Sequence, residues 1–88
     1  MLERELLVSH PLGLHAQASA KIVQVLAAFH SQVTFTAKGR EVNAKSIMGV
    51  MLLAAGPGTT IKVRCTGDDE VAAMAMLEAL FRNRFGDA

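Results

Sequence analysis

His15 is the residue of this chain whose type and setting could support group-transfer chemistry. It lies in the stretch PLGLHAQASAK, where small or flexible side chains follow it. Backbone N–H groups at a helix start lack intrahelical partners and, with the helix dipole, favour an anion. The same positive end favours a neutral, nucleophilic ring. A histidine at a helix start could therefore accept a phosphoryl group on one ring nitrogen while the backbone N–H groups meet its oxygens.

Two alternatives remain open for the polar residues that precede helices. By residue type alone, His15 is more often a turn histidine that caps a helix. Ser46 precedes an apolar run, and serine is a favoured helix N-cap. A phosphate on a helix N-terminal serine is also well placed electrostatically, so Ser46 is a candidate for regulatory phosphorylation. The capping and the regulatory interpretation of Ser46 are compatible.

The apolar segment after Ser46 has more apolar side chains than one helix face can bury. Two stripes are present, and together they comprise Ile47, Val50, Met51 and Ala54 on one side and Met48, Leu52 and Ala55 on the other. An exposed methionine-rich patch suits docking with several partners. A helix that is buried on most sides fits the pattern equally well.

Periodicity predicts the elements that must position these residues. Apolar residues at Ile22, Val25, Leu26 and Phe29 share one helix face, with Gln17, Lys21 and Gln24 on the opposite one. Strict alternation marks a strand at TTIKVRC. The sequence predicts strands over residues 3–10, 32–37, 40–44 and 59–65, with a tight turn at Lys38-Gly39. It predicts helices over residues 16–28 and 47–55, and a last helix from GDDE to FRNRFG.

This order, βαββαβα, predicts an α+β fold. The sheet is expected to be four-stranded and antiparallel, with three helices covering one face in an open-faced two-layer sandwich. No repeat or linker is visible, so residues 1–88 are expected to form a single domain.

Composition excludes several function classes. A net charge of +1 and the absence of tryptophan and tyrosine argue against nucleic-acid binding. No apolar run is long enough to span a bilayer, and the N-terminus does not read as a signal peptide. The lone Cys65 cannot form an internal disulfide and fits a cytoplasmic setting. The three histidines have no nearby thiols, so no metal site is expected, and no cofactor is implied.

The segments LGLHAQASAKIV and VNAKSIMGVMLLAA together resemble the HPr family, the histidine-containing phosphocarriers of the phosphoenolpyruvate-dependent phosphotransferase system. The resemblance covers nearly the whole chain. It implies that His15 accepts a phosphoryl group from Enzyme I and passes it to Enzyme IIA domains of a sugar or nitrogen-related branch. The protein would then be a carrier, not an enzyme.

The resemblance also implies roles for other residues. Ser46 matches the regulatory serine that an HPr kinase/phosphorylase modifies where one exists. Ile47, Met48 and Met51 match the apolar patch that docks partners, and Ala16 and Ala18 would supply helix N-terminal amides. Family members are expected to be small monomers.

Gln17 departs from the family pattern, which has arginine two residues after the histidine. Glutamine can donate hydrogen bonds, but it brings no charge and no fork of donors. We expect this to weaken stabilisation of the phosphohistidine, with Lys21, one turn further on, as a partial substitute. A second hypothesis follows, in which the chain is a regulatory binding protein controlled through Ser46 with impaired transfer at His15.

Overall fold

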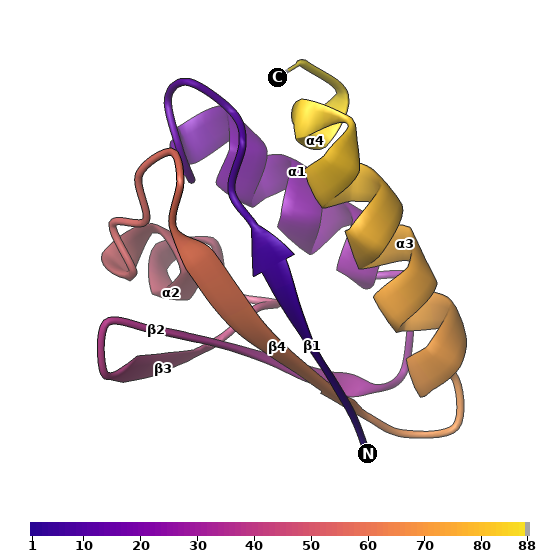
Figure 1. Cartoon of the computed structure of the whole chain (residues 1–88). Coiled ribbons are helices and arrows are strands. Elements are labelled where there is room, and N and C mark those ends of the chain that lie inside the picture. The colour runs from indigo at the N-terminus through magenta and orange to yellow at the C-terminus, as the bar shows by residue number, and fades with distance from the viewer. Residues whose placement is uncertain (88) are drawn as a thin grey trace.

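The chain folds into one sheet with helices on a single face, and the other face stays open (Figure 1). This computed structural model describes residues 1–87. The elements, in chain order, are β1 (Leu2–Leu7), α1 (Ala16–Leu26), β2 (Gln32–Ala37), β3 (Arg40–Asn43), α2 (Ile47–Leu52), β4 (Thr60–Thr66), α3 (Glu70–Arg82) and the short α4 (Arg84–Asp87). The predicted α+β class and element order are confirmed, with α4 added after α3.

The sheet is antiparallel throughout, in the order β1-β4-β2-β3. Alternation sorts its side chains by face. On the open face, Glu3 pairs with Arg64 across β1 and β4, with an N–O distance of 2.7 Å. The β2–β3 turn has positive φ at both Lys38 and Gly39, which is the geometry of a type I′ hairpin turn. The tight turn predicted at these two residues is therefore confirmed.

The core lies between the covered face of the sheet and the helices. Its largest fully buried side chains are Phe35, Phe85, Ile22, Leu26, Ile61, Met74 and Leu77. The alternation seen in β4 and the spacing seen in α1 thus bury the side chains that the sequence pattern indicates. Because α1 contacts both α2 and α3, the three helices form one layer.

Two helices end earlier than predicted. In α1, Ala28 and Phe29 donate to carbonyls three residues back, so the last turn tightens and the α-helix ends at Leu26. In α2, Ala54 adopts φ +49°, a left-handed conformation that ends helices and is usually taken by glycine. The helix therefore ends before Gly56 and Pro57, the two residues at which the sequence predicts its end.

The C-terminal segment departs from the predicted continuous helix. Asn83 caps α3, and Arg84, Phe85 and Gly86 all have positive φ. This reversal turns Phe85 back into the core, where its ring packs edge-on against Phe81 at 5.0 Å between centroids. Burial of an aromatic ring offsets the backbone strain of the two left-handed residues that are not glycine, Arg84 and Phe85.

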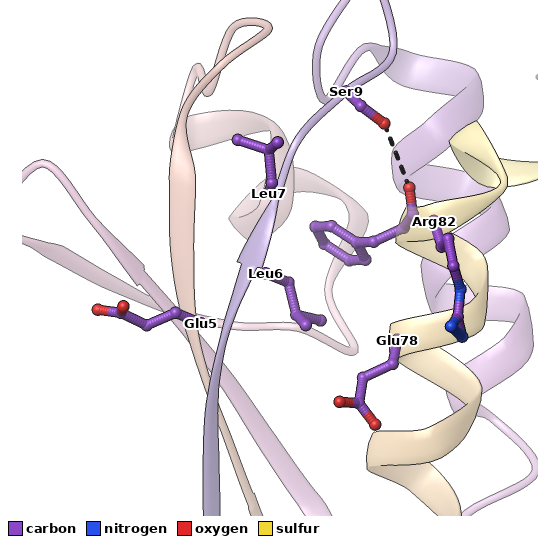
Figure 2. A pocket seen from close by; sticks show the side chains of 7 residues that line it. Glu5, Leu6, Leu7, Ser9, Glu78 and Arg82 are labelled. Carbon is purple, nitrogen blue, oxygen red and sulfur yellow. Dashed lines mark hydrogen bonds between the residues drawn. The ribbon is translucent and has the colours of Figure 1, made fainter.

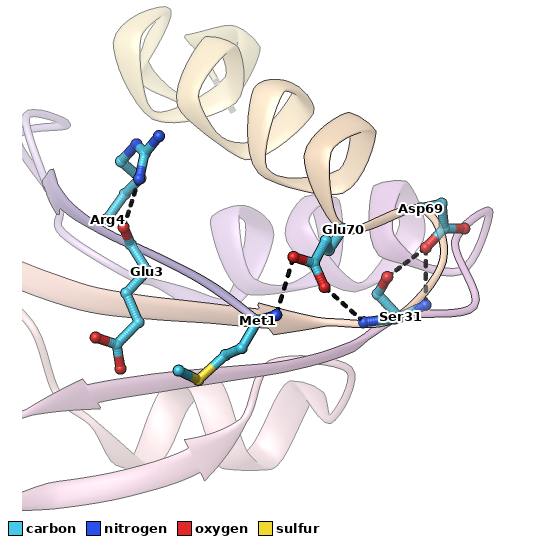
Figure 3. Close-up of polar contacts among 7 residues, drawn as sticks. Met1, Glu3, Arg4, Ser31, Asp69 and Glu70 are labelled. Atoms are coloured by element: carbon cyan, nitrogen blue, oxygen red, sulfur yellow. Dashed lines mark hydrogen bonds and ion pairs between the residues drawn. The ribbon is translucent and has the colours of Figure 1, made fainter.

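Polar contacts fix the end of the molecule that carries the α1–β2 and β4–α3 loops (Figure 3). The Asp69 carboxylate accepts from the Ser31 hydroxyl and from the backbone N–H groups of His30 and Ser31. Glu70 accepts from the N–H of Gly67 and pairs with the N-terminal ammonium at 3.0 Å. The Asp69 bonds tie the α1–β2 loop to the start of α3, and the Glu70 ion pair ties the N-terminus to the same place.

Candidate functional site

The loop between β1 and α1 presents His15, and it is clamped to the loop after α2. The N–H of Leu14 donates to the carbonyl of Ala55 at 2.9 Å, and that of Gly13 donates to the carbonyl of His10 at 2.9 Å. Gly13 has φ +65°, and a Cβ there would lie 2.4 Å from the Ala55 carbonyl oxygen. Only glycine combines this backbone conformation with this close approach.

His15 is the N-cap of α1, which begins at Ala16 as predicted. Its backbone is extended (φ −74°, ψ 179°), and its side chain makes no capping hydrogen bond. Instead, Nδ1 lies 3.0 Å from the carbonyl oxygen of Gly13. A carbonyl only accepts, so Nδ1 carries the proton in this contact. The ring is therefore bonded to the preceding loop and not to the N–H groups of α1.

The other ring nitrogen is covered. Nε2 of His15 is buried and has no hydrogen-bond partner among the described residues. The ring of His10 packs against the His15 ring, with centroids 4.6 Å apart and planes inclined at 33°. In this orientation neither nitrogen of His15 is both free and open to an incoming group.

The first turn of α1 keeps its donors available. Ser19 donates to the His15 carbonyl, whereas the N–H groups of Ala16, Gln17 and Ala18 have no acceptor within residues 1–87. Gln17 is exposed and Ala18 is buried. Three converging donors at a helix N-terminus are suited to oxygens of an anion that His15 would carry. No side chain of the first turn is acidic, so none opposes that anion.

Lys21 is the nearest cation along α1 to Gln17. It lies four residues after Gln17, which places the two on the same helix face, and it is exposed. The role of Lys21 as a partial substitute for the missing cation stays a prediction.

Ser46 caps α2 with its side chain. Its Oγ accepts from the backbone N–H of Gly49 at 3.1 Å, so the capping interpretation is confirmed. Ser46 is half-buried and directly precedes the exposed part of α2. A modification there would change the charge beside that surface.

One side of α2 is an exposed apolar surface. Val50 is buried, but large apolar side chains on the outer side remain open to solvent: Ile47 (42% exposed), Met48 (76%), Met51 (43%) and Leu52 (58%). Leu12, 68% exposed, adds an apolar side chain on the loop that carries His15. We call these five residues the apolar patch. Burial of α2 on most sides is thus the wrong alternative.

A groove between β1 and α3 lies elsewhere (Figure 2). It is lined by Glu5, Leu6, Leu7, Ser9, Glu78, Phe81 and Arg82. His15 is not part of this lining, so the candidate chemistry belongs to an open surface and not to this groove. Within residues 1–87 no three histidine, cysteine or acidic side chains lie close enough to hold a metal ion, and no helix is long and apolar enough to cross a membrane.

His10 is the site residue that sequence reasoning missed. It is only 8% exposed, and its Nδ1 accepts from the backbone N–H of Leu12 at 3.0 Å. The available signal was the pair of histidines on either side of the PLGL turn. Spacing alone did not reveal the contact, because the turn at Gly13 is what brings the two rings together.

Comparison with known proteins decides what this arrangement belongs to. Residues 2–83 match the family described as PTS HPr component phosphorylation site. The chain belongs to the HPr family. The phosphocarrier protein HPr of Xylella fastidiosa (strain 9a5c) is 61% identical over 99% of this chain and 98% of its own length. The phosphocarrier protein HPr of Cupriavidus necator is 53% identical over the same shares of the two chains.

Solved structures agree. The crystal structure of HPr-C-His from Thermoanaerobacter tengcongensis superimposes with a TM-score of 0.94 at 38% identity, over 100% of this chain and 99% of that one. The chain is therefore a phosphocarrier of the phosphotransferase system and not an enzyme, and it has the HPr fold. Its partners are proteins of that system, as membership of the HPr family implies.

Proposed function

We propose that His15 is the phosphoryl acceptor, that Enzyme I is the donor, and that an Enzyme IIA domain receives the group. In each transfer the bond between phosphorus and the donor breaks as a bond between phosphorus and the acceptor nitrogen forms. The observation that carries the proposal is the position of His15 as N-cap of α1, beside three backbone donors without acceptors. This arrangement would stabilise charge on a phosphoryl group.

The ring of His15 must turn before it can react. In the resting orientation Nδ1 donates to Gly13, and Nε2 is covered. A rotation about the side-chain bonds would bring the ring out of the loop and toward the N–H groups of Ala16, Gln17 and Ala18. The polar side chain at position 17 would then be the nearest one available to the phosphoryl oxygens, and it brings no positive charge.

The apolar patch is the proposed docking surface for both partners. It includes Ile47, Met48 and Met51 on α2 and Leu12 on the loop of His15, all exposed. Methionine side chains adapt to different surfaces, which suits a carrier that must bind a donor and then an acceptor. A monomer in the cytoplasm would present this patch and His15 together.

Ser46 is proposed as a regulatory phosphorylation site. It sits at the edge of the apolar patch, so a phosphate there would place negative charge beside a surface that docks through apolar contacts. Charge in such an interface disfavours docking. A cognate kinase and ATP should give an acid-stable label that Ser46→Ala abolishes, together with weaker labelling of His15 by Enzyme I.

The experiment that tests the phosphoryl acceptor uses Enzyme I, phosphoenolpyruvate and intact mass measurement. The wild-type chain should gain one acid-labile phosphoryl group, and His15→Ala should gain none. Labelling of His15→Ala would show that the acceptor is another residue. An unlabelled wild type beside a labelled Gln17→Arg variant would favour the regulatory binding protein with impaired transfer.

A further inference from the structure

We propose that His10 is a positioning residue, which holds the unphosphorylated His15 ring in its closed orientation until a partner docks. The inference rests on the proposed role of His15 as phosphoryl acceptor. It concerns a residue outside the first turn of α1 and outside the apolar patch. Four contacts around the two rings carry it.

The first contact fixes His10 itself. Its Nδ1 accepts from the backbone N–H of Leu12, so that nitrogen carries no proton and the neutral ring is protonated at Nε2. Its backbone carbonyl accepts from Gly13. Both bonds lie within one tight turn, and they set the direction of the His10 ring before any contact with His15.

The second contact joins His10 to the core. Phe85 lies 6.3 Å from His10 between ring centroids, with planes inclined at 36°. Phe85 is 1% exposed and rests on Phe81, so it belongs to the rigid core. The His10 ring therefore packs both on the core, through Phe85, and on the His15 ring. We call it the aromatic wall of the site.

The third and fourth contacts hold His15 against this wall. Its ring packs on His10 at 4.6 Å, and its Nδ1 donates to the carbonyl of Gly13, the residue whose N–H is bound by His10. The buried Nε2 of His15 opposes these contacts, because it lacks a hydrogen-bond partner. This raises the free energy of the closed orientation, in which Nδ1 is bonded to Gly13 and Nε2 is covered. Because this cost opposes the contacts that hold the ring, loss of the contact with His10 should shift His15 toward an orientation in which Nε2 is open.

Two substitutions separate the ring of His10 from its role in the turn. His10→Asn keeps an acceptor for the N–H of Leu12, because asparagine bonds backbone two residues on in the same way, but it removes the aromatic wall. His10→Phe keeps the wall and loses the acceptor. A purely structural role would make the asparagine variant behave as wild type, whereas positioning by the ring makes the phenylalanine variant do so.

The test uses potassium phosphoramidate, a small phosphoryl donor that needs no docking. Intact mass follows labelling, and His15→Ala gives the background from other histidines. We expect His10→Asn to be labelled between about twofold and tenfold faster than wild type, the range that one aromatic contact supports. His10→Phe should be labelled at a rate close to that of wild type. Nitrogen NMR should show the protonated Nδ1 of His15 in wild type and in His10→Phe, and a mixture of tautomers in His10→Asn.

Equal labelling rates for wild type and His10→Asn would overturn the inference, as would a faster rate in His10→Phe alone. Ser31→Ala is the matched control for general loss of stability, because its hydroxyl serves the opposite end of α1. It should be labelled at the wild-type rate. Absence of label from His15 in every variant, with Enzyme I as well, would instead count against the proposed phosphoryl acceptor.

Discussion

At the scale of single residues, the proposed mechanism gives position 17 control over how strongly this carrier holds its phosphoryl group. The three N–H groups of the first turn of α1 are supplied by the backbone and do not depend on side-chain type. Gln17 is exposed beside them and adds neutral donors only. In this proposal the backbone N–H groups bind the anion, and the side chain at position 17 adjusts the strength of that binding.

Replacement of Gln17 by arginine should therefore strengthen the phosphorylated state. Hydrogen bonds from a cation are stronger than those from a neutral amide, so we expect the phosphohistidine to hydrolyse about fivefold to tenfold more slowly in Gln17→Arg. The measurement is the decay of the phosphorylated mass at fixed pH and salt. Gln24→Arg adds the same charge at an exposed position nearly two turns further along α1, and it should decay as wild type. Equal decay of the two variants would contradict a local role for position 17.

At the scale of elements, the clamp between the His15 loop and the loop after α2 depends on Gly13. Gly13→Ala would combine a left-handed backbone with a Cβ 2.4 Å from the Ala55 carbonyl oxygen, so we expect a loss of about 2–4 kcal/mol in the free energy of unfolding. Gly39→Ala is the matched control. Its φ is +75° but nothing lies within 4 Å of its Cβ position, so only about 1 kcal/mol should be lost. Chemical denaturation measures the free energy of unfolding of both variants. Equal losses would show that the close approach of Gly13 to Ala55 does not contribute to stability.

The junction between α1 and α3 gives the protein an acid-sensitive contribution to stability. Hydrogen bonds from the Ser31 hydroxyl and the His30 backbone lower the pKa of Asp69 from 3.8 to about 2. A lowered pKa in the folded state means stability that is present above about pH 4 and lost as pH falls toward 2. Asp69→Asn should therefore be less stable at neutral pH and should show a flatter stability profile between those values. Asp68→Asn, at the exposed neighbouring position, is the control and should keep the wild-type profile. If the free energy of unfolding of Asp69→Asn fell between about pH 4 and pH 2 as steeply as that of wild type, this account would be refuted.

The sequence predicted much of the fold because its elements follow strict periodicity. Alternation in 59–65 and the spacing of Ile22 and Leu26 indicate side chains that are buried, and Val25 on the same helix face is partly buried. Helix ends were predicted less well, because Ala54 takes a left-handed conformation that residue type does not favour. His10 was missed for a related reason, since contact between two rings across a turn depends on Gly13 and on the core behind Phe85.

At the scale of the whole molecule, the one-sided helical layer places His15 and the apolar patch on neighbouring loops and helices. The Leu14–Ala55 hydrogen bond joins the segment that carries His15 to the segment that follows α2. A partner that covers the patch would thereby also cover the loop of His15. Donor and acceptor proteins can then use one surface in turn, which is what a carrier requires.

A charge placed on the apolar patch should weaken docking without affecting the fold. Met48 is 76% exposed, so Met48→Lys removes little buried surface but puts a charge on the proposed interface. We expect the KM of Enzyme I for this variant to rise about tenfold, with little change in kcat. Val71→Lys, at a 71% exposed position on α3, should keep the wild-type KM. If Met48→Lys and Val71→Lys had the same KM, Enzyme I would not dock on the apolar patch.

The central claim is that this chain carries a phosphoryl group on His15 from one protein to another, and a discharge measurement tests it most directly. The chain is loaded with Enzyme I and phosphoenolpyruvate, separated from both, and mixed with an Enzyme IIA domain while the intact masses of both proteins are followed. We expect the phosphoryl group to leave the chain and to appear in equal amount on the Enzyme IIA domain, with no transfer from His15→Ala. A loaded chain that keeps its phosphoryl group with every Enzyme IIA domain of its host, or one loaded at another residue, would contradict the claim.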